Sequence, residues 1–427
     1  MKIEKIRNEY VDEFYYKGIM DSGLEVIIYP KAEFVKKFVN ITVGYGSFDS
    51  SYEMPDGELI HTPQGIAHYL EHQMFEDPEI NFFKKFEEIG SSVNAYTSHY
   101  STVYHCDTVN NLKESIYYLM NLVQNLNITD ESVEKERGII RQEILMYQDE
   151  PQWAVSNNLM KALMQYHPSR EDIAGSVESI SQIDTETIKD CYEKFYTPLN
   201  TKVLIFGDVN PDEMFEYVDG LQSEAFKSRR AEPKRYYRKE PMEIAEREMI
   251  ERRKVVTAYF ELGYKSVKPA LNSIYEYNAA LRIALDIIAG RSSRLFEEAY
   301  EKQYVKDVFS FDVQLDDDVS CIYFANDSNK VDECIELIRT AVEQFKQEGI
   351  DEKSFEQKKR KMVGKVISSY NSLQTIANNF TYQSTRKRDY FKQIEAYNNL
   401  TLDFVNQAYR YFFEGDYSAV SKLIVEE

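Results

Sequence analysis

An internal repeat limits the folds open to this chain more than any other feature of the sequence. Residues 102–144 and residues 320–366 share one order of elements: a strand, a polar turn, a long helix, a break with aspartate and a charged helix. Within them, residues 128–144 align on residues 350–366 without a gap. A repeat of about 200 residues is far longer than a solenoid unit. It predicts two related α+β domains that arose by duplication, unless chance similarity of amphipathic patterns produces the likeness.

Alternating and helical patterns predict the strands and helices of the first domain. Four segments alternate like strands, and four others have helical periodicity. The expected strands are 24–29, 38–43, 93–97 and 101–106, and the expected helices are 62–72, 82–86, 111–126 and 131–147. In the second half, residues 255–263 resemble residues 39–48 as a strand that precedes a long helix.

The most basic run of the chain lies between the two halves. Residues 226–239 read FKSRRAEPKRYYRK, and polar runs that contain proline often mark domain boundaries. We expect a first domain over residues 1–225, a charged linker over 226–245 and a second domain over 246–427. The run could instead bind nucleic acid or an acidic partner. A linker of this kind could also pair with acidic faces of its own domains.

Charge and composition exclude several classes of function. The formal net charge is −21, which argues against a phosphate-backbone binder and against docking on an anionic membrane. No apolar run approaches the length of a membrane span, and the charged N-terminus has no signal-peptide pattern. The four cysteines are sparse and unclustered, so neither a disulfide framework nor a cysteine metal site is indicated. We expect a cytoplasmic protein without nucleic-acid or membrane partners.

All six histidines lie within the first 167 residues, so imidazole chemistry belongs to the first half. His68 and His72 are four residues apart, which puts them about 40° apart on one helical face. Two imidazoles at this spacing can grip one ion, and zinc is the usual metal for such ligands. Glu71 falls beside the metal, where it can take a proton from bound water. His-x-x-Glu-His is the inverse of the common zinc-peptidase helix motif.

A catalytic zinc ion needs a third protein ligand and an open position. Glu136 and Glu143 lie seven residues apart in an expected helix, hence on one face, and either could complete the site. On a helix rich in glutamate, the alternative is that both acids are simply solvated.

Three sequence runs resemble motifs of the insulinase/pitrilysin-type zinc metallopeptidases. Residues 65–75 (GIAHYLEHQMF) resemble the zinc helix, 92–98 (SVNAYTS) the substrate-facing strand and 134–144 (EKERGIIRQEI) the third-ligand helix. Residues 167–168, 173–175 and 290–296 (GRSSRLF) also match, and the resemblance extends from about residue 23 to about residue 370. It is specific in the first half and weaker in the second.

The resemblance implies a function, a fold and a role for each matching residue. It implies a zinc endopeptidase with His68, His72 and Glu143 as zinc ligands and Glu71 as the general base. Glu136 would be an acid beside the metal site that orients a ligand histidine. Asn94 and the backbone around Ala95 would receive a peptide substrate. The implied fold is a tandem pair of α+β domains, each an antiparallel sheet covered by helices, which face each other across a chamber.

The second half departs from the pattern of the family. After Ser-Arg-Leu-Phe the family continues to an arginine and, seven residues later, a tyrosine that help to hold the scissile carbonyl region. The matching positions here are Tyr300 and Asp307, and Lys365 matches Glu143. A carboxylate cannot stabilise a developing oxyanion. Two interpretations follow. The chain is the zinc-bearing subunit of a heterodimer whose homologous partner supplies the Arg–Tyr pair, or the protein has lost full activity.

Two further classes stay open at this point. A non-catalytic scaffold or processing-complex subunit of the same family would bind zinc without cleaving any peptide, alone or with a partner. An unrelated zinc hydrolase would act on a small molecule and need no partner chain.

Overall fold

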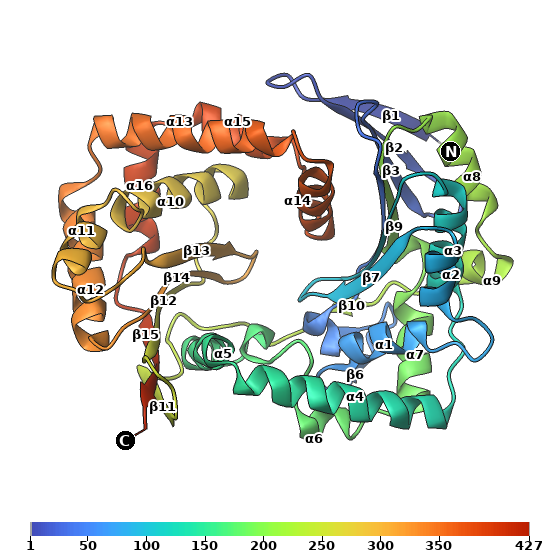
Figure 1. The fold of residues 1–427 in the computed structure, drawn as a ribbon, viewed down its shortest axis with the longest axis horizontal. Helices are drawn as coiled ribbons and strands as arrows, with labels where there is room; N and C mark the ends of the chain where they lie inside the picture. The colour runs from blue at the N-terminus through green and yellow to red at the C-terminus, as the bar shows by residue number, and fades with distance from the viewer. Residues whose placement is uncertain (1, 427) are drawn as a thin grey trace. The chain divides into compact units, whose positions relative to one another are not determined.

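The computed structural model describes residues 2–426, which pack into two compact units. Unit 1 is built from the N-terminal segment up to Leu145 with Asp172–Tyr237 and Ser369–Tyr390. Unit 2 is built from Met146–Glu171 and Arg238–Ser368 with the C-terminal segment that begins at Phe391. Each unit therefore contains chain from both halves of the sequence (Figure 1).

Unit 1 has a seven-stranded sheet in the order β1-β2-β3-β9-β4-β8-β7. Its strands are β1 (Lys2–Arg7), β2 (Phe14–Ile19), β3 (Glu25–Pro30), β4 (Lys37–Val43), β7 (Ser92–Thr97), β8 (Thr102–Thr108) and β9 (Thr201–Gly207). Every neighbouring pair is antiparallel except β3 and β9, which are parallel. Because β7 stands at the end of the order, one of its edges has no neighbour in the sheet.

The residues of β4 alternate, so its apolar side faces a core that it shares with several helices. Val39, Ile41 and Val43 of β4 are fully buried in the same core as the apolar sides of the covering helices. The helices of unit 1 are α1 (Ile66–Phe75), α2 (Phe82–Glu88), α3 (Leu112–Gln124), the greater part of α4 (Asp130–Asp149), α6 (Val177–Ile180), α7 (Thr185–Phe195), α8 (Pro211–Gly220), α9 (Glu224–Ser228) and α14 (Leu373–Thr385). A small second sheet combines β5 (Ser51–Glu53), β6 (Leu59–His61) and β10 (Lys234–Arg235).

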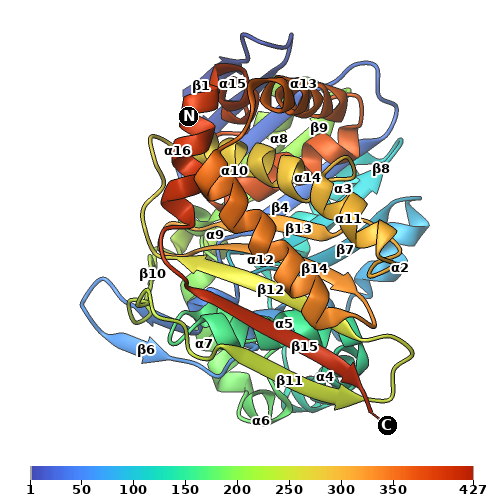
Figure 2. The ribbon, with the colours of Figure 1, turned by 90° about the vertical axis from the view of Figure 1, so that its left-hand side faces the viewer.

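Unit 2 repeats the same topology in a five-stranded sheet of order β11-β15-β12-β14-β13 (Figure 2). Its strands are β11 (Glu248–Arg253), β12 (Tyr259–Ser266), β13 (Ser310–Leu315), β14 (Ser320–Asp327) and β15 (Ser418–Val425). Its helices are α5 (Pro151–Leu163), α10 (Ile274–Ile288), α11 (Arg294–Glu301), α12 (Val331–Glu348), α13 (Glu352–Ser369), α15 (Lys392–Asn399) and α16 (Leu402–Phe412). The pair β11 and β15 is parallel, as β3 and β9 are in unit 1. The α+β class and the two homologous domains are thus confirmed, with one parallel pair in each otherwise antiparallel sheet.

One helix from each half packs on the sheet of the other half. Helix α14 lies on the face of β4 opposite to α1, where Thr381 accepts a 2.8 Å hydrogen bond from the Asn40 amide. Helix α5 lies on β12 and β15 of unit 2. A side chain at Gly263 of β12 would meet Leu159 and Leu163 of α5 at 2.9 and 2.8 Å, so glycine permits this close approach. Each packing unit therefore includes residues from both sides of the expected linker at 226–245. The expected domain boundary stays a prediction.

The basic run between the halves makes specific contacts with unit 1. Arg235 forms a bidentate ion pair with the buried Asp49 at 2.8–2.9 Å. Arg229 lies over the ring of Tyr192 at 4.4 Å, and Arg230 donates to the Ser22 carbonyl. The basic run thus pairs with an acidic residue of its own unit, as one of the expectations for it had it.

No helix within residues 2–426 has both the length and the hydropathy that a membrane crossing requires.

Candidate metal centre

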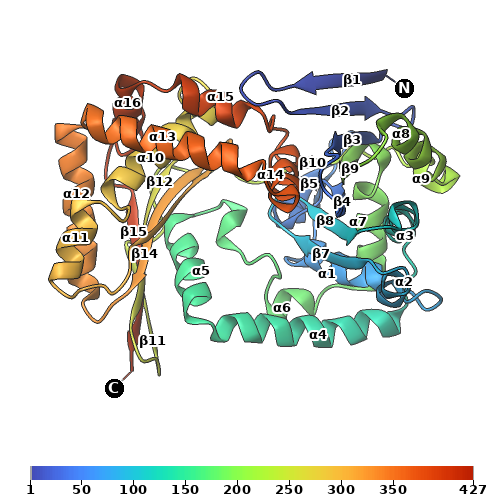
Figure 3. The same ribbon diagram turned by 45° about the horizontal axis from the view of Figure 1, so that its top comes forward.

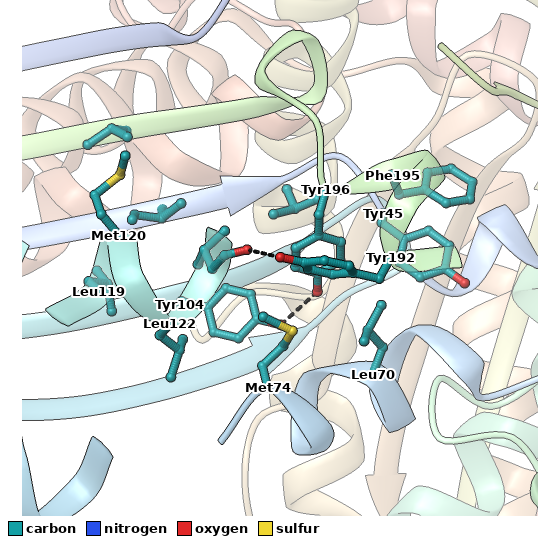
Figure 4. Packing of buried hydrophobic residues seen from close by; sticks show 14 of the residues in the cluster. Tyr45, Leu70, Met74, Tyr104, Leu119, Met120, Leu122, Tyr192, Phe195 and Tyr196 are labelled. Carbon is teal, nitrogen blue, oxygen red and sulfur yellow. Dashed lines mark hydrogen bonds between the residues drawn. The ribbon is translucent and has the colours of Figure 1, made fainter. Parts of the chain in front are cut away.

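Helix α1 carries the His-x-x-Glu-His motif and begins where the backbone demands a glycine. Gly65 has a φ of +89°, and a side chain there would lie 2.3 Å from the Ala174 carbonyl oxygen. On the side of α1 away from the histidines, Leu70 and Met74 point into the core (Figure 4). The same core contains Tyr104 of β8, Tyr192 of α7 and Tyr196, which follows α7. The burial of that side fixes which side of α1 carries the histidines.

His68, His72 and Glu143 come together as the sequence predicts. The Glu143 carboxylate lies 3.8 Å from His68 Nε2 and 3.5 Å from His72 Nε2. One ligand atom from each of the three residues lies within 4.8 Å of the others. Within residues 2–426 no other group of three or more histidine, cysteine, aspartate or glutamate side chains has a geometry that could hold a metal ion. Helix α1 lies between β7 and α4 (Figure 3).

Glu136 occupies a different place from Glu143. Its carboxylate is 2.9 Å from His72 Nδ1, and the residue is only 4% exposed. Nδ1 of His72 therefore donates to Glu136, which leaves Nε2 directed at Glu143. The sequence left the two acids interchangeable, and this geometry separates them.

The charges of the cluster fit a cation. Burial opposes the charged form of His72, but its hydrogen bonds with Glu136 and Glu143 raise the pKa of this imidazole. Burial and the neighbouring His72 lower the pKa of His68. The hydrogen bond from His72 lowers the pKa of Glu143. Two carboxylates and two imidazoles thus favour one positive charge at their centre, and two nitrogens with one oxygen form a donor set of catalytic zinc sites.

Glu71 lies beside these ligands and is held by a strand residue. Thr97 of β7 donates a 2.6 Å hydrogen bond to Glu71 Oε2. Glu71 is 8% exposed, and burial raises its pKa. A carboxylate made more basic by burial is a better acceptor for a proton from water beside a cation site. The role of Thr97 was missed from the sequence, because only its place in β7 next to α1 reveals it.

Asn94 and Ala95 lie in the middle of β7. The side chains of β7 alternate in exposure, and Asn94 is on the exposed side. Its Oδ1 accepts a 2.9 Å hydrogen bond from the Ala95 N–H, so this N–H points away from β8. The edge of β7 therefore presents a backbone donor that a neighbouring side chain now satisfies.

The positions that differ in the second half lie in unit 2. Tyr300 of α11 is 58% exposed and packs on Phe296 at a centroid distance of 5.8 Å. The Asp307 carboxylate accepts a hydrogen bond from the Val308 N–H.

Most of the chain is similar to known proteins. Residues 55–176 match the family described as Insulinase (Peptidase family M16), and residues 182–362 match the family described as Peptidase M16 inactive domain. The uncharacterized zinc protease YmfH of Bacillus subtilis is 31% identical over 425 residues, which are 99% of each chain. The uncharacterized zinc protease YmxG of the same organism is 25% identical over 85% of this chain and 89% of its own.

Solved structures agree with this family. A crystal structure of an M16-like peptidase from Alicyclobacillus acidocaldarius has a TM-score of 0.91 and 29% identity, and covers 100% of this chain and 99% of its own. A protease from Helicobacter pylori has a TM-score of 0.79 over 99% of both chains. At 22% identity, the second likeness speaks for the fold alone.

Proposed function

This chain belongs to the insulinase family of peptidases, family M16, and from that membership we propose that it is a zinc-dependent endopeptidase. In this proposal His68, His72 and Glu143 hold the metal, and Glu71 is the general base. The observation that supports it most strongly is the convergence of the three ligand atoms within 4.8 Å, with Glu71 hydrogen-bonded beside them.

The metal supplies one part of the chemistry. When bound, zinc acts as a Lewis acid that polarises a peptide carbonyl and makes water nucleophilic near neutral pH. The protein residues around it fix the geometry. Glu136 holds the Nδ1 proton of His72, so Nε2 keeps its lone pair for the ion.

Glu71 moves the proton in the proposed reaction. Its burial keeps the pKa of the carboxyl above the usual range, so the group can take a proton from the attacking water and return it to the leaving amine. Thr97 holds Oε2, which leaves Oε1 as the oxygen that exchanges the proton. Both residues act without binding the metal.

The proposed substrate is an extended peptide that adds a strand to the free edge of β7. Strand addition draws its affinity from main-chain hydrogen bonds and tolerates many sequences. The Ala95 N–H becomes a donor to such a peptide once the Asn94 amide turns away from it. Asn94 and Ala95 are thus the proposed contacts to substrate.

A partner chain completes the proposed site. Where the family pattern has an arginine and a tyrosine, this chain has Tyr300, which lacks the positive charge of arginine, and Asp307, whose carboxylate would repel a developing oxyanion. We therefore propose a heterodimer with a homologous subunit that carries the Arg–Tyr pair.

A non-catalytic subunit of the same family is the second candidate. The same two positions favour it, and residues 182–362 match a family described as an inactive domain. The complete set of His68, Glu71, His72 and Glu143 favours the peptidase, because a scaffold has no need of a general base beside a metal site.

Metal analysis with single variants tests the site. We expect the full chain to bind one zinc ion and Glu143→Gln to bind far less. Glu136→Gln should keep zinc at an affinity about 10- to 100-fold weaker, as for other residues that orient a ligand. A Glu136→Gln variant that loses more zinc than Glu143→Gln would exchange the roles of the two acids. Zinc bound without cleavage of any peptide, with or without a partner, would favour the non-catalytic subunit.

A further inference from the structure

A buried glutamine joins the two helices that carry the candidate metal ligands. Gln73 of α1 is 1% exposed, and its amide donates to the Ser132 carbonyl at 3.1 Å. The Ser132 hydroxyl lies 3.0 Å from Gln73 Oε1 and 2.9 Å from the Thr129 carbonyl oxygen, so its one proton is shared between these two acceptors. Ser132 lies in the first turn of α4, where it also accepts from the Thr129 N–H. Both ends of the Gln73 amide therefore hold the start of α4.

A tyrosine on the same stripe of α1 makes a parallel contact. The fully buried Tyr69 donates its hydroxyl to the Val133 carbonyl. Tyr69 and Gln73 are four residues apart, and each follows a candidate ligand, His68 or His72, by one position. Helix α1 thus has two adjacent stripes, one with ligands and one that grips the N-terminal turn of α4.

The arrangement matters because Glu143 is far along α4 from this grip. Glu143 lies eleven positions after Ser132, which is about 16 Å along a helix axis. Metal–ligand distances tolerate errors of about 0.2 Å, so a tilt of α4 by about 1° about its N-terminal turn already uses that tolerance.

A single contact between two helices acts as a pivot, and a second contact is needed to fix a direction. His72 and Glu136 form one contact at 2.9 Å. The Gln73–Ser132 pair forms another, about one helical turn nearer to the start of α4. The apolar core beneath, with Ile140 and Ile144, is non-directional and does not set this register by itself.

We propose that Gln73, supported by Tyr69, is a positioning residue that sets the direction of α4 so that Glu143 reaches the metal bound by His68 and His72. This inference rests on the proposed function. It assigns a role to a buried polar residue that packing alone does not require, since an apolar side chain of equal volume would fill the same space.

The test compares two buried glutamines in the full chain. Gln73→Met keeps the volume and removes both hydrogen bonds. Gln124→Met is the matched control, because Gln124 of α3 is 4% exposed and its side chain bonds to Met120, Leu221 and Ser223, none of which lies in α1 or α4. We expect both variants to lower the unfolding midpoint of the metal-free chain. Only Gln73→Met should weaken zinc binding, by about tenfold or more in a chelator competition, and change the visible spectrum of the Co²⁺-loaded chain.

A cycle with Ser132→Ala identifies the contact. The double variant should bind zinc no more weakly than Gln73→Met alone, because Gln73→Met already removes the bond that the Ser132 hydroxyl makes to Gln73. Zinc affinity of Gln73→Met within twofold of the wild type, or additive losses in the cycle, would overturn the inference while the proposed function stands. A wild-type chain that binds no zinc would overturn both.

Discussion

At the scale of single residues, Glu71 is the side chain on which the proposed chemistry depends. It is buried and hydrogen-bonded to Thr97, and it lies beside the candidate ligands without being one of them. Its replacement separates catalysis from metal binding more cleanly than any other change in the site.

We therefore expect Glu71→Gln to retain zinc and to cleave peptides about 10²- to 10⁴-fold more slowly, the usual contribution of a general base. The amide keeps the size of the side chain and can still accept from Thr97. Zinc content and single-turnover peptide cleavage, measured on the same preparation, check this. Loss of zinc in Glu71→Gln would sink the assignment of its role.

A second buried carboxyl, Glu261 of β12, makes stability depend on pH. It is 4% exposed, and burial raises its pKa to about 7 although a hydrogen bond with Ser156 opposes the shift. Its Oε2 has no hydrogen-bond partner within residues 2–426. The ordinary value is 4.5, so between pH 4.5 and about 7 the folded state binds more protons than the unfolded state.

The free energy of unfolding should therefore fall as the pH rises through that window, by up to about 3 kcal/mol from this group. Glu261→Gln cannot titrate, so we expect it to lose less stability than the wild type between pH 5 and pH 8. Denaturant unfolding of both proteins at the two pH values measures the difference. Identical pH dependence in the two proteins would contradict this account of Glu261.

At the scale of elements, the two halves repeat one topology but connect their corresponding helices differently. The ungapped alignment of 128–144 on 350–366 puts Lys358 of α13 where α4 has Glu136. Lys358 pairs with Asp286 of α10 at 3.2 Å, and Lys361 pairs with the same carboxylate at 2.7 Å. The ammonium groups of Lys358 and Lys361 thus connect α13 to the Asp286 carboxylate of α10.

Asp286 is 5% exposed, so Asp286→Asn should leave these ammonium groups without a counter-charge. We expect a loss of about 1–3 kcal/mol in the stability of unit 2 and no change in zinc affinity. Asp416→Asn is the control, because its pair with Arg247 is 71% and 68% exposed and should contribute little. Equal unfolding midpoints for the two variants would refute the role of Asp286.

The local elements and the proximity of His68 to His72 were predictable, but the packing of α5 and α14 on the sheet of the other half was not. Periodicity predicted α1, α4, β4 and β8, because each has a regular apolar side that its own half of the chain buries. The spacing of His68 and His72 likewise needs only one helix. Thr97 and Gln73 act across elements, and α14 packs on a sheet built from the other half of the sequence. No local pattern encodes such non-local contacts, so they became visible only in the structure.

At the scale of the whole molecule, the chain carries a full set of candidate metal residues and lacks the expected pair in its second half. In the proposed function, this asymmetry means that the chain supplies the metal residues and a partner subunit supplies the Arg–Tyr pair. The two sheets with matching strand orders agree with a duplication in which only the first copy has the candidate metal residues.

We expect the isolated chain to cleave quenched peptides slowly. Addition of a homologous subunit that carries the Arg–Tyr pair should raise the rate about 10²- to 10³-fold, the contribution of one oxyanion donor. An adjacent reading frame of similar length without His-x-x-Glu-His would identify a candidate partner. A steady-state rate for the isolated chain that the partner does not change would refute the division of chemistry.

The proposed site holds one zinc ion between His68, His72 and Glu143. Anomalous diffraction at the zinc edge, from crystals of the full chain grown with equimolar zinc, locates this ion. We expect one strong peak within about 2.0–2.2 Å of His68 Nε2, His72 Nε2 and a Glu143 carboxylate oxygen, with Glu71 outside bonding distance. A peak at other residues, or none at these three in the zinc-grown crystals, would contradict it.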